Sequence, residues 1–128
     1  MGEITANVNW LAVIVGAVLA FLLGWLWYSP KLFGTKWAEG VGVQPGSAAA
    51  PPAAAMVAQA AGTFLLAWVV GVTAASNALF TFMLVVLTIA VLIAAGGMFS
   101  GKSRYAISTE AGFVLAMGAV MFLVQAVL

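Results

Sequence analysis

The chain has 128 residues, of which 66% are hydrophobic and only 5% charged. A soluble domain carries about 25% charged residues, so this composition excludes a soluble fold and indicates an integral membrane protein. The net charge of +1 gives no reason to expect a nucleic-acid partner, and the sequence contains no cysteine, histidine or aspartate. Disulfides, thiolate nucleophiles, catalytic triads and most metal sites are thereby excluded.

The first ten residues, MGEITANVNW, carry Glu3 and no lysine or arginine. A secretory signal peptide needs a positively charged start, so we expect the apolar run that follows to be retained as a membrane span.

Four uninterrupted apolar runs occupy residues 10–28, 53–75, 78–99 and 105–128. At a rise of 1.5 Å per residue each reaches roughly 28–36 Å, enough to cross a hydrocarbon core of about 30 Å. The runs are continuous and lack the alternation of barrel strands, so they predict helices. The expected fold is therefore all-α: a single transmembrane domain over 1–128, built as a four-helix bundle.

Three connections join the runs. Residues 75–78 and 100–104 are short turns between antiparallel helices. The first connection is longer, and we expect its Ala/Pro-rich stretch at 44–50 to be a flexible linker, preceded by a segment on the cytoplasmic membrane interface.

All four cations lie in two of these connections: Lys31 and Lys36 in the first, and Lys102 and Arg104 in the third. In a four-span protein these connections share one side of the membrane. The positive-inside rule places that side in the cytoplasm and both chain ends outside. The chain is therefore predicted to be a multi-pass membrane protein.

Aromatic residues gather around the end of the first run, where amphipathic rings favour the headgroup region. We expect them to anchor the chain at the interface together with the four cations, of which Lys31 and Lys36 would contact anionic lipid. A ligand-binding aromatic cage is the alternative. The expected aromatic anchors are Trp25, Trp27, Tyr28, Phe33 and Trp37.

Several short motifs resemble a known family. They are Asn9-Trp10, Trp27-Tyr28-Ser29-Pro30 with Leu32-Phe33-Gly34 and Trp37, and Gly101-Lys102 followed by Glu110-Ala111-Gly112-Phe113. With these motifs the chain resembles the small bacterial membrane proteins catalogued as domain of unknown function 1761. The resemblance runs from end to end and implies four spans in the inner (cytoplasmic) membrane of a bacterium, but no established activity.

Small residues recur along one side of the first and last predicted helices, which lets neighbouring helices approach closely in lipid. Packing within the bundle explains this pattern, and self-association or docking to a partner is the alternative. The residues of this predicted packing stripe are Ala12, Gly16, Ala20 and Gly24, and Ser108, Gly112 and Ala119.

Glu110 is the one acidic residue inside a predicted span. At 100° per residue it lies on the same side as Met117 and Met121, nearly opposite the small residues of that helix. If those small residues face the bundle, Glu110 points away from the tightest packing. Gln59 should lie at a similar depth, so we expect a Gln59–Glu110 hydrogen bond, within one chain or between two.

The sequence favours a non-catalytic function, since Glu110 has no second acid, histidine or thiolate to work with. We expect no cofactor and no metal. The favoured hypothesis is an accessory, assembly or structural subunit that acts through transmembrane helix contacts, in a homo-oligomer or a larger membrane complex. The alternative is a small oligomeric transporter or channel in which Glu110 takes up and releases protons.

Overall fold

The computed structural model describes residues 2–42 and 53–128, and the predicted linker at 44–50 lies outside these residues. The described chain forms only helices. They are α1 (Gly2–Thr5), α2 (Trp10–Trp27), α3 (Gly34–Gly40), α4 (Ala53–Ala75), α5 (Leu79–Phe99) and α6 (Arg104–Val127).

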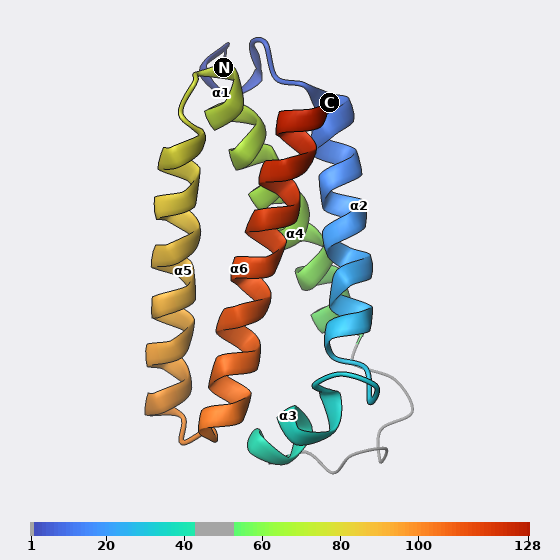
Figure 1. Cartoon of the computed structure of the whole chain (residues 1–128), viewed down its shortest axis with the longest axis vertical. Coiled ribbons are helices and arrows are strands. Elements are labelled where there is room, and N and C mark those ends of the chain that lie inside the picture. The colour runs from blue at the N-terminus through green and yellow to red at the C-terminus, as the bar shows by residue number, and fades with distance from the viewer. Residues whose placement is uncertain (1, 43–52) are drawn as a thin grey trace.

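The four long helices run side by side along the longest axis of the molecule (Figure 1). Helices α2 and α5 run in one direction and α4 and α6 in the other. Helix α6 packs against both α5 and α2, and α4 packs mainly against α2. Both chain termini lie at one end of the bundle, and α3 and the α5–α6 turn lie at the other (Figure 1). The two cation-bearing connections therefore share one end.

Helices α2, α4, α5 and α6 have 18, 23, 21 and 24 residues, and each is long and apolar enough to cross a membrane. Their bounds differ from the predicted runs by at most one residue at either end. Large apolar side chains such as Leu22, Leu92 and Leu123 are 59–65% exposed on their outer faces. This is the surface expected of a multi-pass membrane protein, whose outer side chains meet lipid, and the predicted all-α four-helix fold is confirmed.

Local signals set several helix ends. The Oδ1 of Asn9 accepts a hydrogen bond from Ala12 N at 3.1 Å and caps α2, and Ser103 Oγ caps α6 through Ala106 N, also at 3.1 Å. Such caps satisfy backbone N–H groups that have no partner within the helix. Asn77 and Gly101 take positive φ values in the two tight turns, a conformation that these residue types favour.

The interior of the bundle is filled by large apolar side chains, several of them from α6. The small residues of α2 face them: Met121 Cγ lies 3.6 Å from the position that a Cβ would take at Gly16, and Phe113 Cζ lies 3.1 Å from that position at Gly24. Large side chains of α6 thus pack over small residues of α2. The buried core cluster consists of Val13, Ala20, Ala67, Val70, Phe82, Val86, Phe113, Val114, Met117 and Met121.

Of the predicted packing stripe on α2, Ala12, Gly16 and Ala20 are buried inside the bundle and Gly24 is half-buried. For α6 the expectation of packing within the bundle was wrong, because Ser108 and Ala119 are exposed. Gly112 faces the end of α2: Trp27 Cζ2 lies 3.4 Å from the position that a Cβ would take at Gly112. The physical reason is complementarity: α2 already supplies the small residues at this contact, so α6 turns its large side chains inward.

Candidate functional site

The candidate site lies at the end of the bundle where α3 crosses the beginning of α6 (Figure 1). Glu110 is the seventh residue of α6 and is on the side of the helix that carries Met117 and Met121, which are 6% and 0% exposed. The expectation that Glu110 points away from the tightest packing was therefore wrong. Its side chain is only 17% exposed and reaches toward the α3 connection.

Two side chains of the same chain bind the Glu110 carboxylate. Lys102 Nζ donates to Oε1 at 2.9 Å and to Oε2 at 3.1 Å, and Trp37 Nε1 donates to Oε2 at 2.8 Å. The Lys102 side chain is 31% exposed, so this ion pair is more shielded from solvent than a surface pair. The carboxylate thus ties the α3 segment and the α5–α6 turn to α6.

Backbone contacts hold α3 in place beside this ion pair. Ser103 N donates to the carbonyl oxygen of Gly40 at 3.1 Å, which joins the end of α3 to the start of α6. A Cβ at Gly40 would collide with Ser103 Oγ and would lie 2.7 Å from Ala106 Cβ. The close approach of the two segments therefore requires glycine at this position.

Aromatic rings pack against one another at this end of the bundle, and one of them, Trp37, binds the carboxylate. Ring centroids of Tyr28 lie 5.0 Å from Trp37 and 5.4 Å from Phe113, and those of Trp27 and Phe33 are 4.8 Å apart. These are the tilted and edge-to-face distances of paired rings. Because the paired rings fill the space between them, the arrangement supports a packed cluster and not a ligand cage.

The aromatic residues expected as membrane anchors differ in how they contact their own chain. Trp27 Nε1 donates to the Thr109 carbonyl oxygen at 2.9 Å, and Trp37 is bonded to Glu110, so both rings are directed toward α6. Trp25, in contrast, is 70% exposed. Phe33 and Trp37 are half-buried against their own chain, and their expected role as anchors at the membrane interface stays a prediction.

The remaining cations stay at the surface of this end. Lys31, Lys36 and Arg104 are exposed, and Lys36 Nζ lies 5.5 Å from the ring centroid of Tyr105. That distance allows a cation–π contact. Only Lys102, of the four cations, is committed to an ion pair in the described part of the chain.

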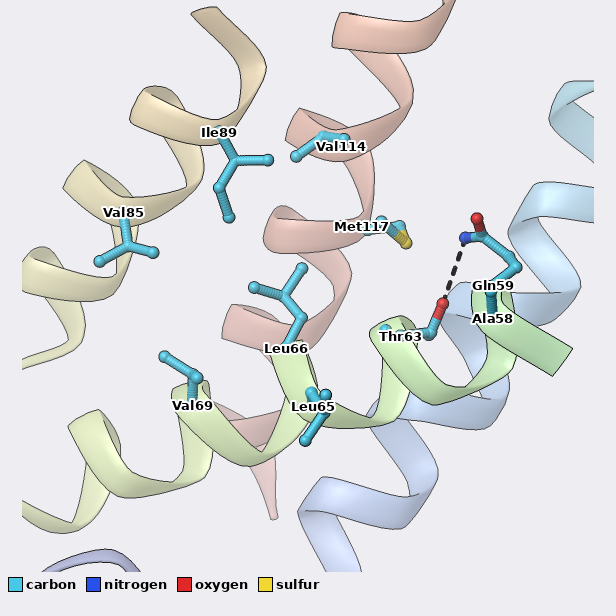
Figure 2. Close-up of a pocket in the computed structure, with 11 residues that line it drawn as sticks. Ala58, Gln59, Thr63, Leu65, Leu66, Val69, Val85, Ile89, Val114 and Met117 are labelled. Atoms are coloured by element: carbon cyan, nitrogen blue, oxygen red, sulfur yellow. Dashed lines mark hydrogen bonds between the residues drawn. The ribbon is translucent and has the colours of Figure 1, made fainter. Parts of the chain in front are cut away.

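The side chain of Gln59 forms its hydrogen bond within α4. Its Nε2 donates to Thr63 Oγ1, one turn further along α4, at 3.2 Å (Figure 2). The structure therefore does not bring Gln59 and Glu110 together within the chain, because Lys102 and Trp37 already occupy the carboxylate. A Gln59–Glu110 contact between two chains stays a prediction.

Tyr28 follows directly after the last residue of α2. Burial raises the pKa of the Tyr28 phenol above its ordinary value of 10.0, and the negative charge of Glu110 raises this pKa further. The folded protein therefore keeps this proton at pH values at which the unfolded chain loses it.

The raised pKa of Tyr28 predicts an alkaline loss of stability. Its contribution is fully present below about pH 10 and is lost as pH rises further, with a slope of at most about 1.4 kcal/mol per pH unit because a single proton is involved. Unfolding in mild detergent from pH 8 to 11.5 measures this loss, and Tyr28→Phe should reduce it. Tyr105→Phe, at a position 38% exposed, is the matched control and should not. Equal pH profiles of the two variants would contradict the prediction.

Within the described residues, no three histidine, cysteine, aspartate or glutamate side chains gather as a set of metal ligands. Residues 11–126 match the family described as "Protein of unknown function (DUF1761)". The chain belongs to this family. No curated protein and no solved structure matches the chain.

The fold brings together motif residues that are far apart in the sequence. Trp27-Tyr28, Phe33 and Trp37 come from the end of α2 and from α3, while Lys102, Glu110 and Phe113 come from the α5–α6 turn and α6. The pairs Trp37–Glu110 and Trp27–Thr109 are 73 and 82 residues apart in sequence. Seven of the motif residues through which this chain resembles the DUF1761 family thus form one structural unit, which we call the α3 clasp: Trp27, Tyr28, Phe33, Trp37, Lys102, Glu110 and Phe113.

Proposed function

We propose that this DUF1761 protein is a non-catalytic accessory, assembly or structural subunit of the bacterial inner membrane that acts through transmembrane helix contacts. The observation that carries the proposal is the distribution of apolar side chains, which both fill the interior of the bundle and cover its outer faces. Val13, Phe82 and Met121 are 0% exposed inside the bundle, while Leu84, Leu92 and Leu123 are 60–65% exposed outside it. Outer faces of this kind are suited to lipid and to other helices.

The contacts of Glu110 support a structural role for this carboxylate. A transport residue must exchange its partner for a proton or a substrate, whereas Glu110 accepts hydrogen bonds from Lys102 at 2.9 Å and from Trp37 at 2.8 Å. Both donors belong to the same chain and to the packed α3 clasp. If the transport alternative held, solute flux through reconstituted protein would be lost in Glu110→Gln.

The proposed orientation has the α3 end of the bundle in the cytoplasm and both termini outside. It is supported by Lys31, Lys36, Lys102 and Arg104, which all belong to this end (Figure 1). Modification of Lys36 by a membrane-impermeant reagent added from outside intact cells would contradict this orientation.

The contact function predicts a fixed assembly. Purification of the untagged protein from its native membrane in a mild detergent should recover it as an oligomer, or with membrane partners in constant ratio. Mass determination of the intact detergent-solubilised complex measures this directly. Recovery of the protein as a lone monomer at every detergent concentration would contradict the proposed function.

A further inference from the structure

The end of the bundle that carries α3 has unpaired positive charge (Figure 1). Lys36 of α3 and Arg104, the first residue of α6, are both exposed, and neither forms an ion pair within the described residues. Lys36 Nζ lies 5.5 Å from the ring centroid of Tyr105, the residue that follows Arg104. The contact between α3 and α6 therefore brings two unpaired cations to the same part of the surface.

The acids at this end leave these two cations without a counter-charge. Glu110 accepts its hydrogen bonds from Lys102 and Trp37. Glu39 is exposed on α3, three residues after Lys36, and forms no ion pair in the described part of the chain. Like charges at close range repel each other, and an anion placed between them removes this repulsion. The surface around Lys36 and Arg104 is therefore suited to an anionic ligand.

The outward face of α6 continues from Arg104 into the predicted span. Ser108, Leu115 and Ala119 are exposed, and at 100° per residue they lie within about 60° of Arg104 around the helix. Ser108 is one turn, roughly 6 Å, further along the axis than Arg104, and the two apolar residues lie beyond it. Charge, a hydroxyl group and apolar surface thus follow one another along this face.

A phospholipid has the same order of groups along its length: phosphate, ester carbonyl and acyl chain. Helix α6 is long and apolar enough to cross a membrane, so side chains on its outward face meet lipid. An inorganic phosphate or an acidic soluble peptide could contact the two cations, but it would leave Ser108 and the apolar residues without a partner. A zwitterionic headgroup carries its own cation, which Lys36 and Arg104 repel. The chemistry of this face therefore favours an anionic lipid.

We propose that Lys36, Arg104 and Ser108 form a binding site for one anionic phospholipid, whose phosphate is held by the two cations and whose acyl chain lies along the outward face of α6. Lysine and arginine bind phosphate through charge-assisted hydrogen bonds. The bound headgroup ties α3 to α6 beside the Trp37–Glu110 hydrogen bond, so anionic lipid stabilises the α3 clasp. The site is more specific than the general attraction of a cationic surface to anionic lipid, because Lys31, exposed in the turn before α3, is not part of it.

Lipid retention by the purified full-length protein tests this site. The protein in mild detergent is titrated with phosphatidylglycerol, and with phosphatidylcholine as the zwitterionic reference, and bound lipid is counted by native mass spectrometry. We expect one phosphatidylglycerol per chain at lipid concentrations that leave phosphatidylcholine unbound. Equal retention of the two lipids would overturn the proposal. Full displacement of phosphatidylglycerol by an equal concentration of inorganic phosphate would overturn the lipid as the ligand.

Single substitutions of the cations separate a defined site from diffuse attraction. Lys36→Gln and Arg104→Gln each remove a charge-assisted hydrogen bond to phosphate and should each weaken phosphatidylglycerol binding at least about tenfold. Lys31→Gln is the matched control, because it removes the same charge from an exposed position at the same end. It should weaken binding no more than about fivefold, the effect of one general surface charge. Equal losses at the three positions would overturn the site.

The position of α3 supplies a second measurement. Trypsin cleavage at Lys31, outside the site, should slow when phosphatidylglycerol is added to the original protein, because the bound headgroup holds α3 against α6. It should not slow in Arg104→Gln, which replaces an exposed side chain and should leave the fold intact. Slowing of the same size in both proteins would overturn the link between the lipid and the α3 clasp.

Discussion

Replacement of Glu110 by alanine is expected to lower the free energy of unfolding by about 1–3 kcal/mol, between the values for an exposed ion pair and for a buried one. The substitution leaves the Lys102 ammonium, whose side chain is 31% exposed, without its counter-charge. It also removes the acceptor of the Trp37 indole N–H. Because the bond from Trp37 is the side-chain hydrogen bond that ties α3 to Glu110 of α6, we expect α3 to detach before the bundle unfolds. Denaturant titration in mild detergent measures the first effect, and trypsin cleavage at Lys36 the second.

Glu39→Gln is the matched control, because Glu39 is an exposed acid on α3 at the same end of the molecule. It removes the same charge and should change the free energy of unfolding by no more than about 0.5 kcal/mol. A double-mutant cycle with Lys102→Met then isolates the ion pair, and the doubly substituted protein should lose less than the sum of the single losses. Additive losses would show that Glu110 and Lys102 do not stabilise each other.

The four spans could be predicted from the sequence because a membrane leaves few alternatives. A run of about 20 apolar residues with no alternation forms a helix in lipid, and its length is set by the bilayer. The two tight turns, before α5 and before α6, could be predicted as well, since Asn77 and Gly101 are residue types that favour positive φ. The short helices α1 and α3 were missed. Helix α1 has 4 residues and α3 has 7, too few for a periodic pattern. Each is held by contacts with a helix distant in sequence, as α1 is by the hydrogen bond from Trp68 Nε1 to the Ile4 carbonyl oxygen.

The partners of Glu110 could not be obtained by matching depths between helices. Gln59 and Glu110 both lie near the start of a span, which predicts a contact between them, but Lys102 reaches the carboxylate from the α5–α6 turn of the same hairpin. Trp37 reaches it from a segment 73 residues away. One sequence signal was present: the motifs that resemble the DUF1761 family contain Trp37, Lys102 and Glu110 together. A shared structural unit is a simple reason for such residues to occur as a set.

The α3 clasp depends on a sharp reversal of the chain after α2. Gly34 N donates to the Ser29 carbonyl oxygen at 2.9 Å, and Phe33 N donates to the Trp27 carbonyl oxygen at 3.2 Å. These bonds fold residues 28–34 into a compact turn that directs the rings of Tyr28 and Trp37 toward each other. A Cβ at Gly34 would collide with the Tyr28 carbonyl oxygen and would lie 2.9 Å from the Ser29 carbonyl carbon. These are backbone atoms, so no side-chain rotation can relieve the overlap.

Gly34→Ala is therefore expected to open this turn and to lower the free energy of unfolding by about 2–4 kcal/mol, as overpacking against a fixed backbone does. Trypsin cleavage at Lys31 and Lys36, both exposed, should become faster as α3 loses its position. Gly96→Ala is the matched control, because a Cβ at Gly96 of α5 would meet nothing within 4 Å. That variant should retain the cleavage rate and the stability of the original protein. If both alanine variants behaved alike, the turn would not be the element that holds Trp37 against Glu110, and the α3 clasp would have to be held by its aromatic and polar side-chain contacts.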